Sequence, residues 1–260
     1  MLRLRFVVVL SSLFAMLPAL LGAADDGLTC ARKHAENTIR FCRDTYGSRH
    51  TPLLVCQLDV ATRSLLPATS KLYTSEGRGG AGPTMNNLQF DTGRLRLLYG
   101  LTEVTGDGRF AAAADEYLTY FMDKLPDADT GFFPWGDHRG YDVVKDEILR
   151  DRHEFKVAWP LWERMYALNP KAVTRQIDSL RLHVIDENRS QGFNRHCPPG
   201  KVPHSMNSSG GAWIAGWAFL FTKTGDAKYL RWARSMADYF WSLRDPETGL
   251  LAAHPYDPAY

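Results

Sequence analysis

The sequence predicts an all-α fold, an α/α toroid or an open arc of one, built from helical hairpins that repeat about every 60 residues. The main observation is an internal repeat, in which TGDGRFAAAADEYLTYFMDKL (105–125) aligns without gaps to TGDAKYLRWARSMADYFWSLR (224–244). A more divergent copy, YALNPKAVTRQIDSLRLHVID, lies between them. In the last copy apolar residues recur at steps of three and four, as one face of a helix requires: Leu230, Ala233, Met236, Phe240 and Leu243. A repeat of this kind is typical of stacked helical pairs, and an α-solenoid is the structural alternative.

Start and stop signals divide each copy into two helices. Asp107 and Asp226 stand where N-cap residues belong, and each follows a glycine that suits a helix end, Gly106 or Gly225. Pro170 suits the first position of a helix in the middle copy. Each repeat therefore reads as a helix, a tight turn, a second helix and a loop.

The segments outside the aligned copies complete this organisation. The stretch AWIAGWAFLF is apolar nearly all round, which predicts an inner, fully buried helix. Ahead of the repeats we expect a helix over about residues 28–45 and a short β-hairpin-like segment, TPLLVCQLDVATRSLLP. Three hairpins and a half are too few to close a toroid, so we expect either an open arc or a chain that is incomplete at its C-terminus.

The N-terminus has the layout of a secretory signal peptide. Two basic residues, Arg3 and Arg5, precede an apolar stretch over 6–21, and small residues follow in LGAADD. We expect cleavage after about residue 24, a secreted or periplasmic location, and a single catalytic domain over 25–260. No later run is apolar for long enough to span a bilayer.

The charge balance gives no reason to expect a nucleic-acid partner. Removing the two leader arginines leaves 29 Lys and Arg against 29 Asp and Glu, so the remaining chain is close to neutral. Nonspecific binding to nucleic acid rests on a strong basic excess, which is lacking here.

Four cysteines follow the leader, and an even count in an exported protein suggests disulfides. If Cys30 and Cys42 share one helix they lie roughly 18 Å apart, too far for a bridge. Both remaining pairings tie Cys197 to the N-terminal region.

Titratable residues collect in the loops that follow each hairpin. If the hairpins are in phase, FPWGDHRGYD places His138, GFNRHC places Arg195 and His196, and AAHPYD places His254 on one rim. A lone histidine is usually structural, but groups at equivalent places in a repeat suggest a site. The segment RDRHEFK (150–156) adds a further cluster, although it lacks the second histidine of the HExxH zinc motif.

The segment FFPWGDHRGYDVVKDEILRDRHEFK, together with GFNRHC, resembles the family 2 polysaccharide lyases and related periplasmic pectate lyases of α/α-toroid fold. The likeness covers roughly residues 86–244. It implies that His138, Glu154 and His196 bind a divalent transition metal and that Arg195 is the base that abstracts a proton. Such lyases continue well beyond the length of this chain.

The chemistry of uronate cleavage is consistent with these roles. β-Elimination removes a weakly acidic proton next to a carboxylate, so the developing negative charge has to be neutralised, and Lys156 can assist a metal in doing so. Imidazole and carboxylate ligands suit Mn, Co, Ni or Zn better than calcium. For binding the acidic polysaccharide we assign four residues, of which the first would be a platform for a sugar ring: Trp135, Tyr141, His153 and Asn87.

The leading prediction is therefore a metal-dependent lyase that acts on polygalacturonate or its oligosaccharides. A glycoside hydrolase on the same scaffold would instead use two carboxylates, such as Asp142 and Glu154. A third possibility is a non-catalytic uronate-binding arc or an inactive fragment.

Overall fold

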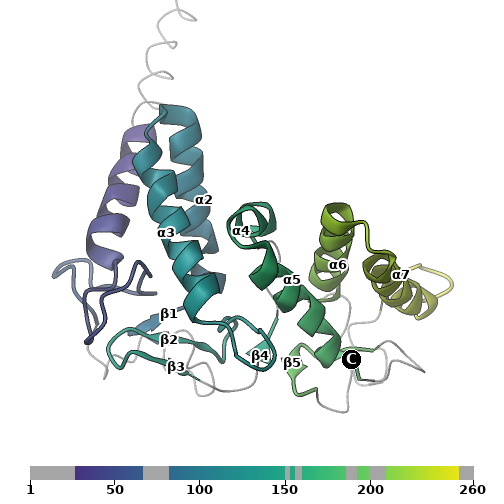
Figure 1. The fold of residues 1–260 in the computed structure, drawn as a ribbon. Coiled ribbons are helices and arrows are strands. Elements are labelled where there is room, and N and C mark those ends of the chain that lie inside the picture. Colours follow the sequence, from purple (N-terminus) through teal and green to yellow (C-terminus); the bar gives the residue numbers. More distant parts are fainter. Residues whose placement is uncertain are drawn as a thin grey trace, which may run out of the picture.

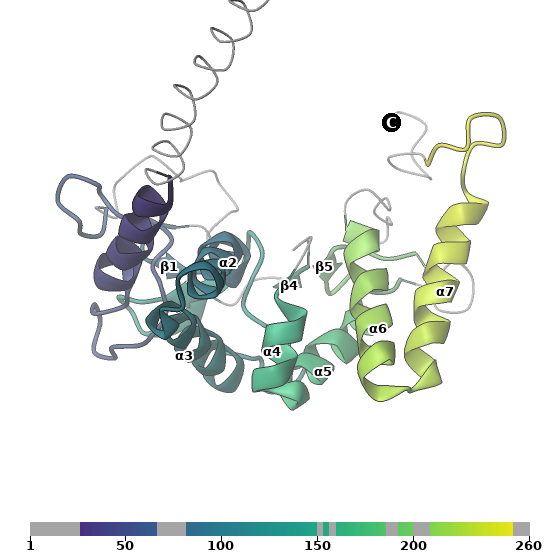
Figure 2. The same ribbon diagram turned by 90° about the horizontal axis from the view of Figure 1, so that it is seen from above.

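The structure is a computed structural model that describes residues 27–66, 82–149, 153–155, 160–185, 192–199 and 209–251. Three helical hairpins follow one another along an open curve (Figure 1, Figure 2). This confirms the mostly helical part of the prediction, while closure into a toroid stays a prediction. The hairpins are α2 (Leu88–Thr105) with α3 (Gly108–Lys124), α4 (Trp162–Leu168) with α5 (Pro170–Ser179), and α6 (Gly211–Thr224) with α7 (Ala227–Ser242). A 3-10 turn, η4 (Leu180–His183), continues α5.

The predicted helix boundaries are confirmed at several ends. Asp107 Oδ1 accepts a hydrogen bond from Arg109 N at 3.1 Å, and Asp226 Oδ1 accepts one from Lys228 N at 2.8 Å. Gly106 and Gly225 end α2 and α6 with φ values of 72° and 70°, the left-handed conformation in which glycine is favoured. Pro170 is the first residue of α5.

The repeat also extends to the turns that follow α3 and α7. Asp127 Oδ1 accepts hydrogen bonds from Asp129 N and from the amide and hydroxyl of Thr130. Asp245 Oδ1 accepts the same three bonds in the last copy, from Glu247 N and from the amide and hydroxyl of Thr248. The two loops therefore leave their helices through the same turn, and the sequence match there reflects a shared backbone geometry.

The N-terminal region contains the predicted helix but not the predicted hairpin. A helix over 27–37 passes into η1 (Thr38–Cys42). Within the described part of the expected β-hairpin, 51–66, no strand is formed. The backbone pairing joins this segment to the end of η1 instead, through Asp44 N to Leu53 O at 2.9 Å and Val55 N to Cys42 O at 2.8 Å.

Short strands that the sequence did not predict lie at one end of the hairpins (Figure 1). One antiparallel sheet joins β1 (Met85–Asn86), β2 (Gly140–Asp142) and β3 (Glu147–Leu149). A second joins β4 (His153–Glu154) to β5 (His196–Cys197), with Glu154 opposite His196. These strands carry four of the residues that the sequence assigned to the site: Tyr141, His153, Glu154 and His196.

The prediction that AWIAGWAFLF is fully buried is wrong. Trp213 and Trp217 of α6 are inaccessible to solvent. Ala215 and Phe219 are half-buried, and with residues of α2 and α4 they line an open cavity of about 720 Å³. None of the helices in the described ranges combines the length and apolar character that a bilayer crossing needs.

The predicted disulfides are also not formed. Cys30, Cys42, Cys56 and Cys197 are all free thiols in the structure. Cys197 lies in β5, with its Sγ 3.6 Å from the carbonyl of Leu182. Cys56 lies beside α2, where its carbonyl accepts a hydrogen bond from Arg94 at 2.9 Å. The second hairpin thus holds Cys197 among its own residues rather than near the N-terminal cysteines.

Candidate metal centre

The loop between α3 and β2 places His138. Gly136 has a φ of 91° and packs against β4 so closely that a Cβ there would lie 2.8 Å from the carbonyl oxygen of Glu154. Asn87, the N-cap of α2, donates from Nδ2 to the carbonyls of Gly136 at 2.6 Å and Arg139 at 2.8 Å. These contacts fix both ends of the short segment that contains His138.

The β4–β5 pairing places the other two candidate ligands. Glu154 and His196 are direct partners in this ladder, and Phe155 N donates to the Arg195 carbonyl at 3.1 Å. Side chains opposite each other in an antiparallel pair project from the same face. Two residues 42 positions apart therefore point at the same space.

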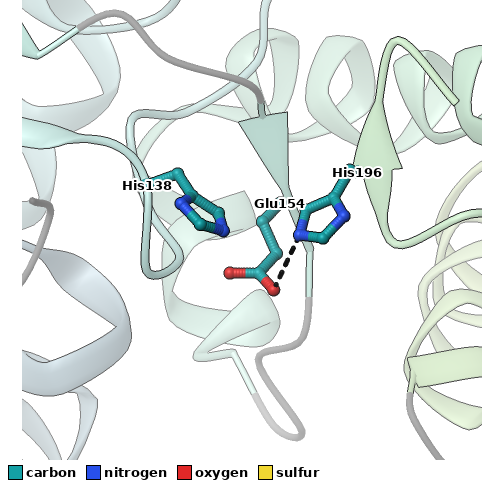
Figure 3. Close-up of side chains that lie close together, drawn as sticks. All are labelled: His138, Glu154 and His196. Carbon is teal, nitrogen blue, oxygen red and sulfur yellow. Dashed lines mark ion pairs between the residues drawn. The ribbon is translucent and has the colours of Figure 1, made fainter. Parts of the chain in front are cut away.

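His138, Glu154 and His196 converge in the structure (Figure 3). One donor atom from each lies within 4.8 Å of the donors of the other two. His196 Nε2 is 3.4 Å from Glu154 Oε1, and the imidazole rings of His138 and His196 are 5.2 Å apart. Asp137 N donates to Glu154 Oε2 at 2.9 Å, so the loop that carries His138 also orients the carboxylate.

The cluster fits a bound cation. Donors on one transition-metal ion at about 2.0–2.2 Å are at most roughly 4.4 Å apart, close to the spacing found here. The Glu154 side chain has no solvent exposure, and a buried carboxylate requires positive charge nearby. Two imidazoles and a carboxylate form a donor set that suits a transition-metal ion better than calcium.

Arg195 supplies positive charge next to this cluster. Its Nε lies 3.0 Å from Glu154 Oε1, and about a third of its side chain is exposed. Arg195 thus reaches both the buried carboxylate and the solvent.

Three of the four residues assigned to substrate binding have no solvent exposure, so the structure does not support those assignments. Trp135 has 0% exposure and packs among aromatic rings, including Phe133 and Phe155. His153 also has 0% exposure, and its ring stacks on Phe132 at 3.7 Å. Neither can contact a sugar.

Asn87 is fully buried as well, Tyr141 is nearly so, and both have structural contacts. Asn87 has 0% exposure and holds the 136–139 segment as described above. Tyr141 has 3% exposure, and its hydroxyl donates to Asp146 Oδ1 at 3.3 Å. Lys156 and His254 lie outside the described residues.

Sequence reasoning missed several residues that support the centre. Asn194 accepts from His196 N through Oδ1 at 2.9 Å and so orients the ligand-bearing turn. His183 contacts both His153 and the Asn194 carbonyl. An asparagine side chain that accepts a hydrogen bond from the amide two residues later is a recognisable turn pattern. GFNRHC therefore did contain a signal for Asn194.

Comparison with known proteins gives the chain its family. The family model described as periplasmic pectate lyase matches residues 52–210, a range that contains all three candidate ligands and Arg195. A pectate disaccharide-lyase of Dickeya dadantii (strain 3937) is 23% identical over 257 residues, covering 87% of this chain and 46% of that protein. The chain thus spans about half the length of this relative. Because the family model covers more than half of its residues, the chain belongs to the periplasmic pectate lyase family.

Proposed function

We propose that this protein is a metal-dependent pectate lyase that cleaves polygalacturonate or oligogalacturonides by β-elimination, in the periplasm or outside the cell. The observation that carries the proposal is the convergence of two imidazoles, a buried carboxylate and Arg195 in a chain of this family. The name of the Dickeya relative, a pectate disaccharide-lyase, supports the same substrate class.

The reaction requires a base and a cluster of positive charge. The C5–H proton of a galacturonate unit is transferred to the base and a C4–C5 double bond forms. The C4–O bond breaks with its electron pair on oxygen, and the departing sugar oxygen takes up a proton from water to become a hydroxyl. Negative charge develops on the C5 carboxylate as the proton leaves, and stabilising that charge lowers the barrier. A divalent ion held by His138, Glu154 and His196 would supply this stabilisation as a Lewis acid.

Arg195 is the proposed base. Guanidinium groups are ordinarily protonated because their pKa exceeds about 12, so this role needs surroundings that disfavour positive charge. In the structure Arg195 Nε lies 3.0 Å from Glu154 Oε1, so this side chain is next to the carboxylate that would hold the cation. Lys156, three positions from His153, is proposed to assist in neutralising the substrate carboxylate.

The hydrolase alternative has little support from the geometry. Asp142 accepts hydrogen bonds from Val144 N at 3.0 Å, Lys145 N at 3.1 Å and the Thr84 hydroxyl at 3.1 Å. Its carboxylate thus caps the turn between β2 and β3, whereas a hydrolytic pair needs both carboxylates directed at one glycosidic bond.

The test is a polygalacturonate assay with the full chain that follows the ultraviolet absorbance of the unsaturated product. We expect product formation with manganese, loss of it with a chelator, and recovery when manganese is restored. Arg195→Ala should abolish turnover while manganese binding is retained, and Arg234→Ala, an exposed arginine on α7, should behave like the wild type. His196→Ala should weaken manganese binding itself.

Each alternative predicts a different result in the same assay. New reducing ends without ultraviolet-absorbing product would indicate a hydrolase. Binding of oligogalacturonides with no turnover at any manganese concentration would indicate a non-catalytic protein. Unchanged elimination by Arg195→Ala would contradict the assignment of the base.

A further inference from the structure

Two buried histidines lie behind the candidate metal centre and are not used by the proposed reaction. His153 and His183 both have 0% exposure, and their rings are 5.0 Å apart. His153 Nδ1 lies 2.8 Å from His183 Nε2, which is a hydrogen-bond distance between two imidazoles. A contact of this kind requires one nitrogen to donate and the other to accept.

The neighbouring groups determine which nitrogen carries each proton. The Asn194 carbonyl can only accept, so His183 Nδ1, at 2.8 Å, carries hydrogen and donates to it. The Trp135 indole can only donate, so His153 Nε2, at 3.2 Å, accepts. His153 Nδ1 then donates to His183 Nε2, and every polar atom of both rings has a partner.

The result is a hydrogen-bond chain with one direction, from Trp135 through His153 and His183 to Asn194. Both histidines are neutral in this arrangement. Because both tautomers are fixed, each hydrogen bond has one donor and one acceptor, and this hydrogen-bond chain holds its two ends at a defined separation.

The two ends of this chain are attached to the two loops that carry candidate ligands. Trp135 lies three residues before His138, and Asn194 lies two residues before His196, whose amide donates to its side chain. In the middle, His153 directly precedes Glu154 on β4. The hydrogen-bond chain therefore contacts all three ligand-bearing segments from the buried side.

We propose that His153 and His183 are positioning residues that set the separation of the three ligand-bearing segments, so that His138, Glu154 and His196 can bind one ion. The inference rests on the metal centre of the proposed function. Aromatic packing holds the pair in place, with Phe132 stacked on His153 and the Trp213 ring edge-on to His183 at 4.8 Å.

A first test needs no metal and no substitution. The full chain labelled with nitrogen-15 in histidine is studied by long-range proton–nitrogen correlation spectroscopy, which separates the two tautomers and the imidazolium. The hydrogen-bond chain predicts that His153 and His183 are both neutral with the proton on Nδ1. An Nε2–H tautomer or an imidazolium at either residue would overturn it.

The second test measures manganese affinity by titration calorimetry in matched variants. Trp135→Phe removes the donor to His153, and Trp217→Phe is the control, because that buried indole donates to the Ile177 carbonyl at 3.3 Å, away from the centre. We expect Trp135→Phe and His183→Phe to weaken manganese binding about 10- to 100-fold, the range typical of residues that orient metal ligands. Trp217→Phe should lower thermal stability and leave the affinity unchanged.

The outcomes separate this inference from the proposed function. A wild-type protein that binds no manganese would remove the metal centre itself, whatever the tautomers are. Wild-type binding with equal affinity in Trp135→Phe and Trp217→Phe would leave the lyase proposal intact and overturn the positioning role. Trp135→Phe retains the aromatic packing, so it decides the question even if His183→Phe does not fold.

Discussion

At the residue scale, adjacent side chains in GFNRHC have distinct positions around one carboxylate. His196 projects from β5 opposite Glu154, while Arg195 contacts the same carboxylate with a partly exposed side chain. Asn194 orients the turn through the amide of His196. Three consecutive residues thus provide a support, a candidate base and a candidate ligand.

Gly136 is the residue at which the loop approaches Glu154 most closely. An alanine Cβ there would lie 2.8 Å from the Glu154 carbonyl oxygen and 3.0 Å from its Cβ, at a φ of 91°. We expect Gly136→Ala to lose about 1–3 kcal/mol of unfolding free energy from backbone strain. Displacement of Glu154 should also weaken manganese binding at least about tenfold.

Gly225→Ala is the matched control for this substitution. Gly225 also has a positive φ, 70°, but a Cβ there would meet nothing within 4 Å. Chemical denaturation should therefore show a loss of stability in both variants, and calorimetry should show a loss of metal affinity in Gly136→Ala alone. Equal manganese affinities in the two variants would mean that the close approach of Gly136 is not needed for the site.

At the scale of elements, the site depends on strands of two or three residues and on one helix N-terminus. The β4–β5 ladder brings together segments that are far apart in the sequence. The N-terminus of α2 contributes Asn87, which caps its helix through Gln89 N at 3.0 Å and holds the His138 segment through two carbonyls. One side chain thus joins the helical scaffold to the site.

Asn87→Ala should therefore lower the free energy of unfolding by more than the loss of an ordinary N-cap does. Loss of an N-cap costs about 0.5–2 kcal/mol, and two buried carbonyls would also lose their donor. Asp226→Ala removes the cap of α7 together with a contact to Lys228 Nζ at 3.9 Å, far from the site, and is the matched control. We expect Asn87→Ala to show the larger drop in melting temperature and a weakened manganese affinity, and Asp226→Ala to retain wild-type affinity. A similar, small stability loss in both variants with no change in affinity would contradict this account of Asn87.

Local signals in the sequence were sufficient for the helix ends. Asp107, Asp226 and Pro170 occupy the predicted positions because caps and first-turn prolines act within a few residues. The strands were missed because two or three residues are too few to show an alternating pattern. The repeat predicted that the loops of His138 and His196 lie on one rim, and family resemblance implied that these two residues and Glu154 bind one metal. The β4–β5 pairing that brings Glu154 to His196 is not local, so the sequence did not predict it.

The direction of a side chain in a loop was also beyond the sequence. Trp135 was expected to face a sugar because it lies in the same loop as His138. The chain instead turns at Gly136, so that Trp135 faces the core and His138 faces the centre. The positive φ of Gly136 therefore turns Trp135 away from the side where a sugar was expected. Gly136 itself is packed against Glu154, a contact that is not local in the sequence.

At the scale of the whole molecule, hydrogen bonds around the buried Asp91 carboxylate connect the N-terminal segment to the first hairpin. Asp91 of α2 accepts hydrogen bonds from the Tyr117 hydroxyl of α3 at 2.9 Å and from Arg94 at 2.9 Å. Asn86 donates to both Asp91 and the Leu54 carbonyl. Burial raises the pKa of Asp91 to about 6, although Arg94 opposes the shift.

This pKa predicts the direction of one pH effect on stability. The folded state holds the Asp91 proton more strongly than the unfolded state, so this group stabilises the fold most below about pH 4. Its contribution to the free energy of unfolding, up to about 3 kcal/mol, is lost as the pH rises through about 6. We expect the stability of the wild type relative to Asp91→Asn to decline over this interval in denaturation curves.

Asp107→Asn should show the opposite trend. Hydrogen bonds from Arg109 lower the pKa of Asp107, so its contribution is present at neutral pH and is lost as the pH falls. A wild-type advantage over Asp91→Asn that is constant from pH 4 to pH 7 would show that Asp91 does not titrate in this range.

The proposed lyase mechanism depends on a single ion bound where the loops of the hairpins meet. Anomalous diffraction from a crystal of the full chain soaked in manganese, with data collected near the manganese edge, tests this most directly. We predict one strong anomalous peak within coordination distance of His138, Glu154 and His196. A fully soaked crystal with no peak there, or with its strongest peak at another site, would contradict the metal centre and the lyase mechanism built on it.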